Sequence, residues 1–176
     1  MKKIITFLNK RSPREWGVFF FVVSAAILSA VFISQKFGFH PCKLCIWQRW
    51  PYTATGVLSL VLIAAANNKT LVKIVLALLG ASFAVGMGIA IFHTGVEYRW
   101  WEFHSDCTGG AYKAGASVDE FLARLKAAPA VRCDQRQPFL FGMTMAFYNA
   151  LTSAGLVLAA LFALYSQRSN SLSQYK

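Results

Sequence analysis

Four cysteines are the residues with the clearest chemical potential in this chain of 176 residues. Cys42 and Cys45 form a C-x-x-C, whose short ring favours a strained, exchangeable disulfide over a structural one. Arg49 follows Cys45 by four residues, so on a helix it lies one turn away on the same face. Its guanidinium could stabilise a Cys45 thiolate and the negative charge on a reduced quinone, or it could snorkel to lipid headgroups. Spacing alone leaves both interpretations open.

The second pair, Cys107 and Cys133, lies 26 residues apart. A structural disulfide closing such a loop would contribute roughly 3–4 kcal/mol, whereas an exchangeable one would accept electrons from a soluble partner. Spacing does not separate these two. A c-type haem needs His directly after the second cysteine, and Ile46 stands there. The second pair lacks the short spacing of zinc sites, so no metal is expected, although His40 and His104 lie near the cysteines.

Four apolar stretches must position these cysteines, because the chain is 56% hydrophobic and soluble domains are about 45–50% apolar. A helix needs about 20 apolar residues to cross a membrane, and none of the stretches contains an acid. We therefore expect an all-α membrane protein, a single domain over residues 1–176 built as a four-transmembrane-helix bundle. The expected spans are Val18–Phe37, Ile46–Ala66, Leu71–Phe92 and Phe139–Tyr165.

The charge distribution predicts the orientation of these spans. Basic residues gather in the N-terminal arm, in the connector between spans two and three and in the C-terminal tail, which places both termini in the cytoplasm. The net charge of +11 is therefore typical of a membrane protein and does not indicate a nucleic-acid binder. The outer loops, about 38–45 and 94–138, hold all four cysteines, in a compartment where disulfides persist.

Two local signals refine this organisation. Pro51 lies near the start of span two and would kink it. In the long loop, Ser117 and Glu120 form a capping-box pattern ahead of apolar residues on one helical face. We expect a short amphipathic helix there, lying on the outer membrane surface.

The segment Pro41–Arg49 resembles the signature of the DsbB family of quinone-dependent thiol oxidases. Three further segments match the family in order and with similar spacing: His93–Glu97, Val131–Asp134, and Gly142–Ala146 with Asn149. The resemblance covers nearly the whole chain.

Two positions depart from patterns seen in some family members. Gln48 stands where some members carry an acid, and Thr144 stands where others have Ser. Neither departure touches a redox atom, but the preference for a particular quinone could differ.

The resemblance implies a route for electrons. A reduced DsbA-like periplasmic oxidase of the thioredoxin fold would attack the Cys107–Cys133 disulfide, with Cys107 forming the mixed disulfide and Cys133 leaving. Electrons would pass to Cys42 and Cys45. Cys45 would face ubiquinone or menaquinone, with Arg49 beside the ring and His93 helping at the quinone site.

The same resemblance implies a bacterial inner membrane location, with lipid and the DsbA-like protein as partners. The alternative is a non-catalytic four-helix membrane scaffold with structural disulfides. A quinone enzyme of the vitamin K epoxide reductase type is disfavoured, because its C-x-x-C is expected late in the bundle.

Overall fold

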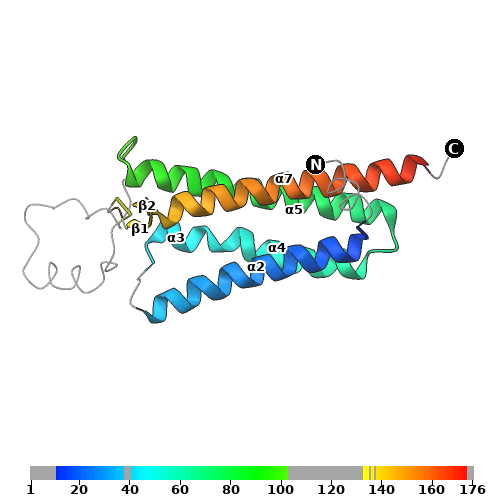
Figure 1. The fold of residues 1–176 in the computed structure, drawn as a ribbon, viewed down its shortest axis with the longest axis horizontal. Helices are drawn as coiled ribbons and strands as arrows, with labels where there is room; N and C mark the ends of the chain where they lie inside the picture. Colours follow the sequence, from blue (N-terminus) through cyan, green and yellow to red (C-terminus); the bar gives the residue numbers. More distant parts are fainter. Residues whose placement is uncertain (1–10, 38–40, 103–132, 135, 137, 174–176) are drawn as a thin grey trace, which may run out of the picture.

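The computed structural model describes residues 11–37, 41–102, 133–134, 136 and 138–173. Four long helices run side by side along one axis (Figure 1). Their bounds are α2 Pro13–Lys36, α4 Arg49–Ala64, α5 Lys69–Glu97 and α7 Met145–Ser173. A short helix, α3 (Lys43–Trp47), precedes α4, and two short strands, β1 (Pro138–Leu140) and β2 (Met143–Thr144), precede α7. In Figure 1, α3 and the strands lie together at one end of the bundle, opposite the start of α2.

The helix starts at the opposite end have recognisable caps. Ser12 and Glu15 form a reciprocal capping box at the start of α2, with Pro13 in the first turn. Asn68 caps α5 by accepting hydrogen bonds from the backbone N–H groups of Thr70 and Leu71, both at 3.1 Å. These caps fix where each helix leaves the connecting segments at this end.

The second predicted span is interrupted near its N-terminal end. A continuous helix from Ile46 with a kink was expected, but α3 ends at Trp47 and α4 begins at Arg49. The reason is Pro51, which has no N–H to bond the carbonyl four residues earlier and whose ring would clash with it. That carbonyl belongs to Trp47, where α3 ends. Gln48 therefore occupies the junction, and its side chain points into the bundle rather than along a helix surface.

The last helix begins later than the predicted span from Phe139. An antiparallel hairpin takes its place, with Pro138 opposite Thr144 and Leu140 opposite Met143. The two connecting residues, Phe141 and Gly142, have φ values of 50° and 75°. Positive φ at both central positions is typical of the tight hairpin turns that match strand twist. The hairpin delivers Thr144 to the end of the bundle and leaves α7 to start at Met145.

The bundle is apolar on the outside as well as the inside. Its centre is packed with buried side chains such as Phe20, Leu62, Leu79 and Phe83. Large exposed apolar residues also cover the outer faces of α2, α4, α5 and α7, a pattern expected where lipid is the solvent. Among the described helices, three are long and apolar enough to cross a membrane, namely α2, α5 and α7 from Met145 to Gln167. The protein is a multi-pass membrane protein.

Helix α4, with 16 residues, is shorter than those three. It nevertheless packs between α2 and α5. Ser24 of α2 and Thr55 of α4 share a hydrogen bond of 2.9 Å between buried hydroxyls, an interhelical contact common in membrane bundles. The predicted amphipathic helix and most of the predicted long loop fall outside the described residues.

Candidate functional site

The site begins with Cys42, whose sulfur caps the short helix α3. Its Sγ accepts a hydrogen bond from the backbone N–H of Cys45 at 3.3 Å and lies 3.0 Å from the Cys45 Sγ. The Cys42 side chain is buried and that of Cys45 is partly exposed. The C-x-x-C thus occupies the first turn of a helix, where unpaired N–H groups favour negative charge on sulfur.

Cys133 lies beside Cys42, although the two are far apart in sequence. Cys133 is buried and belongs to one apolar cluster with Cys42, Leu44 and Val96. Its thiol hydrogen-bonds Cys42, and its sulfur receives backbone N–H groups from Leu44 and Lys43. All three described cysteines are free thiols. A cysteine from each predicted pair therefore meets at the start of α3.

The three thiols differ in acidity. The Cys42 thiol donates a hydrogen bond to Cys45, and this lowers the pKa of Cys45 despite its partial burial. The hydrogen bond from Cys133 lowers the pKa of Cys42, but the bond to Cys45 and burial outweigh it and raise that pKa to about 12. The bond to Cys42 and burial also raise the pKa of Cys133. Cys45 is therefore the most acidic of the three thiols.

His93 approaches the thiols from α5. Its ring is buried, and Nε2 lies 3.5 Å from the Cys42 Sγ. On the other side of the ring, Nδ1 lies 3.0 Å from the side-chain amide nitrogen of Gln48. Because that amide donates to Nδ1, the ring proton sits on Nε2 and is directed toward the Cys42 sulfur.

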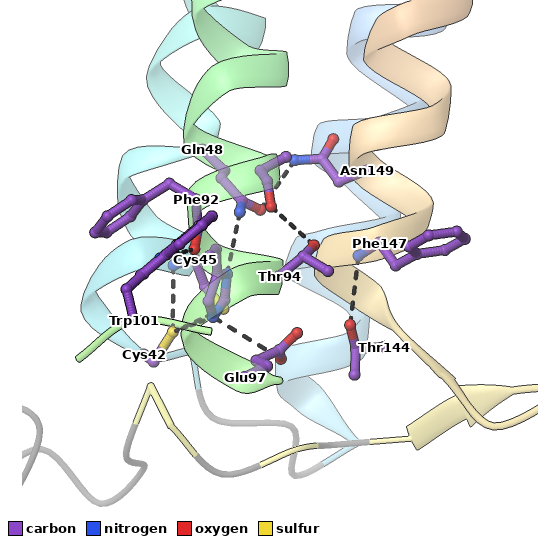
Figure 2. A network of polar contacts seen from close by, with 12 residues as sticks. Cys42, Cys45, Gln48, Phe92, Thr94, Glu97, Trp101, Thr144, Phe147 and Asn149 are labelled. Atoms are coloured by element: carbon purple, nitrogen blue, oxygen red, sulfur yellow. Dashed lines mark hydrogen bonds and ion pairs between the residues drawn. The ribbon is translucent and has the colours of Figure 1, made fainter. Parts of the chain in front are cut away.

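A chain of hydrogen bonds extends from Gln48 into the bundle (Figure 2). The Gln48 side-chain oxygen accepts from the Asn149 amide at 2.9 Å. The Asn149 oxygen accepts from the Tyr52 hydroxyl at 2.5 Å, and that hydroxyl lies 2.9 Å from the Ser153 hydroxyl. We call Gln48, Asn149 and Tyr52 the amide relay. It joins α4 and α7 to His93 of α5 and fixes which ring nitrogen carries the proton.

A buried carboxylate completes this side of the site. Glu97 Oε1 lies 3.9 Å from His93 Nε2, one helical turn away. Thr144, delivered by the β1–β2 hairpin, hydrogen-bonds Glu97, and the Arg136 charge acts on the same carboxylate. Within the described part of the chain, Glu97 Oε2 is buried without a hydrogen-bond partner. The carboxylate therefore has a free acceptor beside the histidine and the thiols.

The segment that follows α5 folds back, so that Trp101 packs against the last turns of that helix. The Trp101 indole N–H donates to the Phe92 carbonyl at 3.0 Å, and its ring stacks on Phe92. The indole passes over Gly95, where a Cβ atom would overlap the ring. Because Gly95 has no side chain, the Trp101 ring can pack against this part of α5, close to His93 in sequence.

Arg49 lies on the α2 side of the C-x-x-C. Its guanidinium carbon is 5.3 Å from the centre of the Phe32 ring. With the Gln35 amide oxygen turned toward it, Nη2 and Nη1 donate to that oxygen at 2.6 and 3.0 Å. Among the described residues, the buried Arg49 Nε has no hydrogen-bond partner. Arg49 therefore pairs with α2 and keeps one donor unsatisfied.

The structure brings together most of the residues that the sequence singled out. Cys42, Cys45, Cys133 and His93 share one site, and Arg49 lies one helical turn from Cys45, while Cys107 lies outside the described residues. Sequence reasoning noted Gln48 and Asn149 only as motif members and gave Tyr52 no role at the site. The signal available for them was their polarity within stretches that are otherwise apolar, which usually marks a functional network.

Comparisons with known proteins identify the family of this chain. The family model described as "Disulfide bond formation protein DsbB" matches residues 12–163. A protein named "Disulfide bond formation protein B" from Xanthomonas axonopodis pv. citri is 30% identical over 86% of this chain and 90% of its own length. Another of that name, from Methylobacillus flagellatus, is 28% identical over 91% of this chain and 98% of its own length.

A third relative, an uncharacterized Rickettsia prowazekii protein, is 23% identical over 94% of this chain and 96% of its own length. No solved structure gave a significant match. The family match spans the C-x-x-C, the histidine and the amide relay alike. The chain therefore belongs to the DsbB family, a family of thiol-disulfide oxidoreductases that act in disulfide bond formation.

Proposed function

We propose that this protein reoxidises a DsbA-like dithiol protein of the thioredoxin fold and passes the electrons through its cysteines to ubiquinone or menaquinone in the bacterial inner membrane. The observation that carries the proposal is the graded row of thiols at the start of α3. Cys133 donates toward Cys42, Cys42 donates toward Cys45, and Cys45 has the lowered pKa. Such a row suits exchange in one direction, since the most acidic thiol leaves most readily.

The first exchange takes electrons from the partner. A partner thiolate attacks Cys107 in the Cys107–Cys133 disulfide and Cys133 leaves as a thiolate. The second partner thiolate then displaces Cys107, so that the partner becomes a disulfide. The partner has lost two electrons and gained a disulfide, while Cys107 and Cys133 have gained those electrons and become thiols.

The second exchange uses the contact between Cys133 and Cys42. The Cys133 thiolate attacks the Cys42 sulfur of a Cys42–Cys45 disulfide, a new Cys133–Cys42 bond forms, and Cys45 leaves with the electron pair. Cys107 then attacks Cys133, which restores the Cys107–Cys133 disulfide and frees Cys42. The backbone N–H groups of Lys43 and Leu44 at the Cys133 sulfur would hold it in line with Cys42 during this step.

Arg49, four residues after Cys45 in the chain, could take part in binding a quinone. The unpaired Arg49 Nε is a buried donor, and leaving such a donor unsatisfied costs about 1–3 kcal/mol. A quinone carbonyl would satisfy it, with the Phe32 ring offering an apolar face. When bound, the quinone supplies an acceptor for two electrons and two protons.

His93 and Glu97 would stabilise charge and hold protons near the thiols during this reaction. His93 Nε2–H is placed to steady negative charge on the Cys42 sulfur. Glu97, with its free acceptor oxygen, is placed to hold a proton next to His93. The amide relay would keep the ring in this tautomer throughout turnover.

The membrane arrangement follows from the packing. We propose that α3 and α4 together make a fourth crossing, because α4 packs between α2 and α5 and its outer face is also apolar. The thiols then lie at one membrane face. The basic residues at the other end, including Arg14 and Lys69, support a cytoplasmic location for that end, so the thiols would face the periplasm.

The proposal is tested with the full chain in detergent. Purified protein is mixed with a reduced thioredoxin-fold dithiol protein, with or without added quinone, and partner thiols are counted over time. Oxidation should require quinone and should stop in Cys42→Ser and Cys45→Ser, with Ser166→Ala at the far end of α7 as a control that retains turnover. No oxidation of the partner even with quinone present would favour a scaffold with structural disulfides, and full turnover in Cys45→Ser would reject the proposed route.

A further inference from the structure

We propose that the reduced site also binds one Zn²⁺ ion through Cys42, Cys45 and His93, and that the bound ion holds the protein in its dithiol form. Zinc binding needs neither quinone nor a partner protein, whereas its effect on turnover rests on the proposed function. The form that binds zinc is the one in which Cys42 and Cys45 are both reduced.

Three ligand atoms of the right kind already converge. The Cys42 Sγ, the Cys45 Sγ and the His93 Nε2 all lie within 4.8 Å of one another. In a tetrahedral zinc site, Zn–S bonds are about 2.3 Å and Zn–N bonds about 2.0–2.1 Å, which separates neighbouring ligand atoms by roughly 3.5–3.8 Å. The Cys42 Sγ to His93 Nε2 distance of 3.5 Å fits directly. The two sulfurs, at 3.0 Å, need to open by less than 1 Å.

The charges of the site also suit a divalent cation. Coordination releases two thiol protons, and two thiolates then neutralise Zn²⁺ without any transfer of electrons. A neutral cluster is far less costly to bury than a free cation. The Glu97 carboxyl group, which lies 3.9 Å from His93, adds negative charge nearby when it is ionised.

The amide relay can support the change of tautomer that zinc requires. Zinc binds a nitrogen lone pair, so His93 would move its proton from Nε2 to Nδ1. Rotating the Gln48 amide by half a turn presents its oxygen to Nδ1–H, and rotating Asn149 presents an oxygen to Gln48. Tyr52, which can accept as well as donate, then receives the Asn149 amide. Every partner stays paired in both states, so the relay becomes the outer support that zinc-binding histidines usually have.

Bound zinc would arrest electron flow. Both sulfurs of the C-x-x-C would be held as metal thiolates, so Cys42 and Cys45 could not rejoin as a disulfide. Turnover would therefore fall in zinc and recover when a chelator removes the ion.

The binding test uses the full chain in detergent, reduced with excess dithiothreitol and desalted without oxygen. Co²⁺ is added first, because its visible absorption reports tetrahedral thiolate ligation, and Zn²⁺ is then titrated to displace it. We expect one Zn²⁺ per chain and loss of the Co²⁺ spectrum in Cys42→Ser and Cys45→Ser. His93→Gln should weaken Zn²⁺ binding at least tenfold, and Gln48→Leu, which removes the outer support, about 10- to 100-fold.

Matched variants keep this test interpretable. Cys107→Ser and His104→Gln change the same residue types outside the proposed ligand set and should leave the Co²⁺ spectrum and the Zn²⁺ stoichiometry unchanged. The disulfide form of the unmodified protein should bind no Zn²⁺ at the site. The proposal is overturned if the reduced protein shows no stoichiometric binding, or if His93→Gln and His104→Gln bind equally.

Discussion

The Nε2 atom of His93 lies 3.5 Å from the Sγ atom of Cys42, across 51 positions of sequence and between two different helices. This contact joins the redox chemistry of the C-x-x-C to the polar network inside the bundle. The Cys42 thiol in turn donates to Cys45. The proton positions on three residues are therefore set together.

The first prediction concerns the acidity of Cys45. Its pKa is lowered mainly by the hydrogen bond from Cys42, so the midpoint of its titration should lie below the usual thiol pKa near 9. Cys42→Ala removes the donor and should move this profile to higher pH, whereas Cys42→Ser keeps a hydroxyl donor and should move it less. The alkylation rate of Cys45 as a function of pH, followed by mass spectrometry, measures the shift. Identical profiles for the two variants would contradict the assigned cause.

The amide relay gives the second prediction. Gln48→Leu leaves His93 Nδ1 and the Asn149 amide without partners, and each unsatisfied buried group costs about 1–3 kcal/mol. We expect lower thermal stability and turnover reduced about tenfold, because the ring proton is no longer held toward Cys42. Gln167→Leu, at the other end of the bundle, also loses a hydrogen bond, the one to the Arg11 carbonyl. Gln167→Leu should retain turnover. Equal losses of turnover in the two variants would show that the amide relay has only a structural role.

Arg49 carries the third prediction. Arg49→His shortens the side chain and removes the donors that engage Gln35, together with the unpaired Nε. We expect the apparent KM for quinone to rise about tenfold, equivalent to about 1.4 kcal/mol of binding, with a smaller change in kcat. Arg14→Gln, at the opposite end of the bundle, is the control for loss of a positive charge. Steady-state kinetics at varied quinone concentration separate kcat from KM. An unchanged KM would show that Arg49 does not contribute to quinone binding.

The fourth prediction compares two glycines of α5. A Cβ at Gly95 would overlap the Trp101 ring, whereas a Cβ at Gly88 meets no atom within 4 Å. Gly95→Ala should therefore displace the indole and destabilise the protein by about 1–3 kcal/mol. Gly88→Ala should be neutral or slightly stabilising, since alanine is the better helix former. Tryptophan fluorescence and thermal unfolding report both effects. Equal behaviour of the two variants would show that Trp101 does not rest on Gly95.

Much of the architecture could be predicted from sequence, because long apolar stretches without acids have few structural solutions in lipid. The interruption at Gln48 was harder to predict. Pro51 indicated that the helix would be distorted. Whether a helix bends or breaks at such a point depends on whether the junction residue, here Gln48, finds hydrogen-bond partners. Those partners lie on α5 and α7. The hairpin before α7 was missed because Phe139 and Leu140 are as apolar as the residues of a membrane span. The turn depends on positive φ values at Phe141 and Gly142, which hydropathy does not reveal.

The sequence pointed to several residues of the candidate site but not to the contacts between them. The C-x-x-C, Arg49 and His93 could be identified from residue type and motif. The contact between Cys133 and Cys42 could not, since it joins members of two predicted pairs and depends on how the chain returns to the start of α3. The amide relay likewise depends on three helices meeting at one depth.

The most direct test of the electron route is a single turnover without oxygen or partner protein. Fully reduced protein is mixed with one equivalent of quinone, quinol formation is followed spectroscopically, and the disulfide product is located by mass spectrometry. The account predicts one quinol per pair of thiols lost, with Cys42 joined to Cys45 or to Cys133, and no quinol in Cys45→Ser. Quinol formed at an undiminished rate by Cys45→Ser would contradict it.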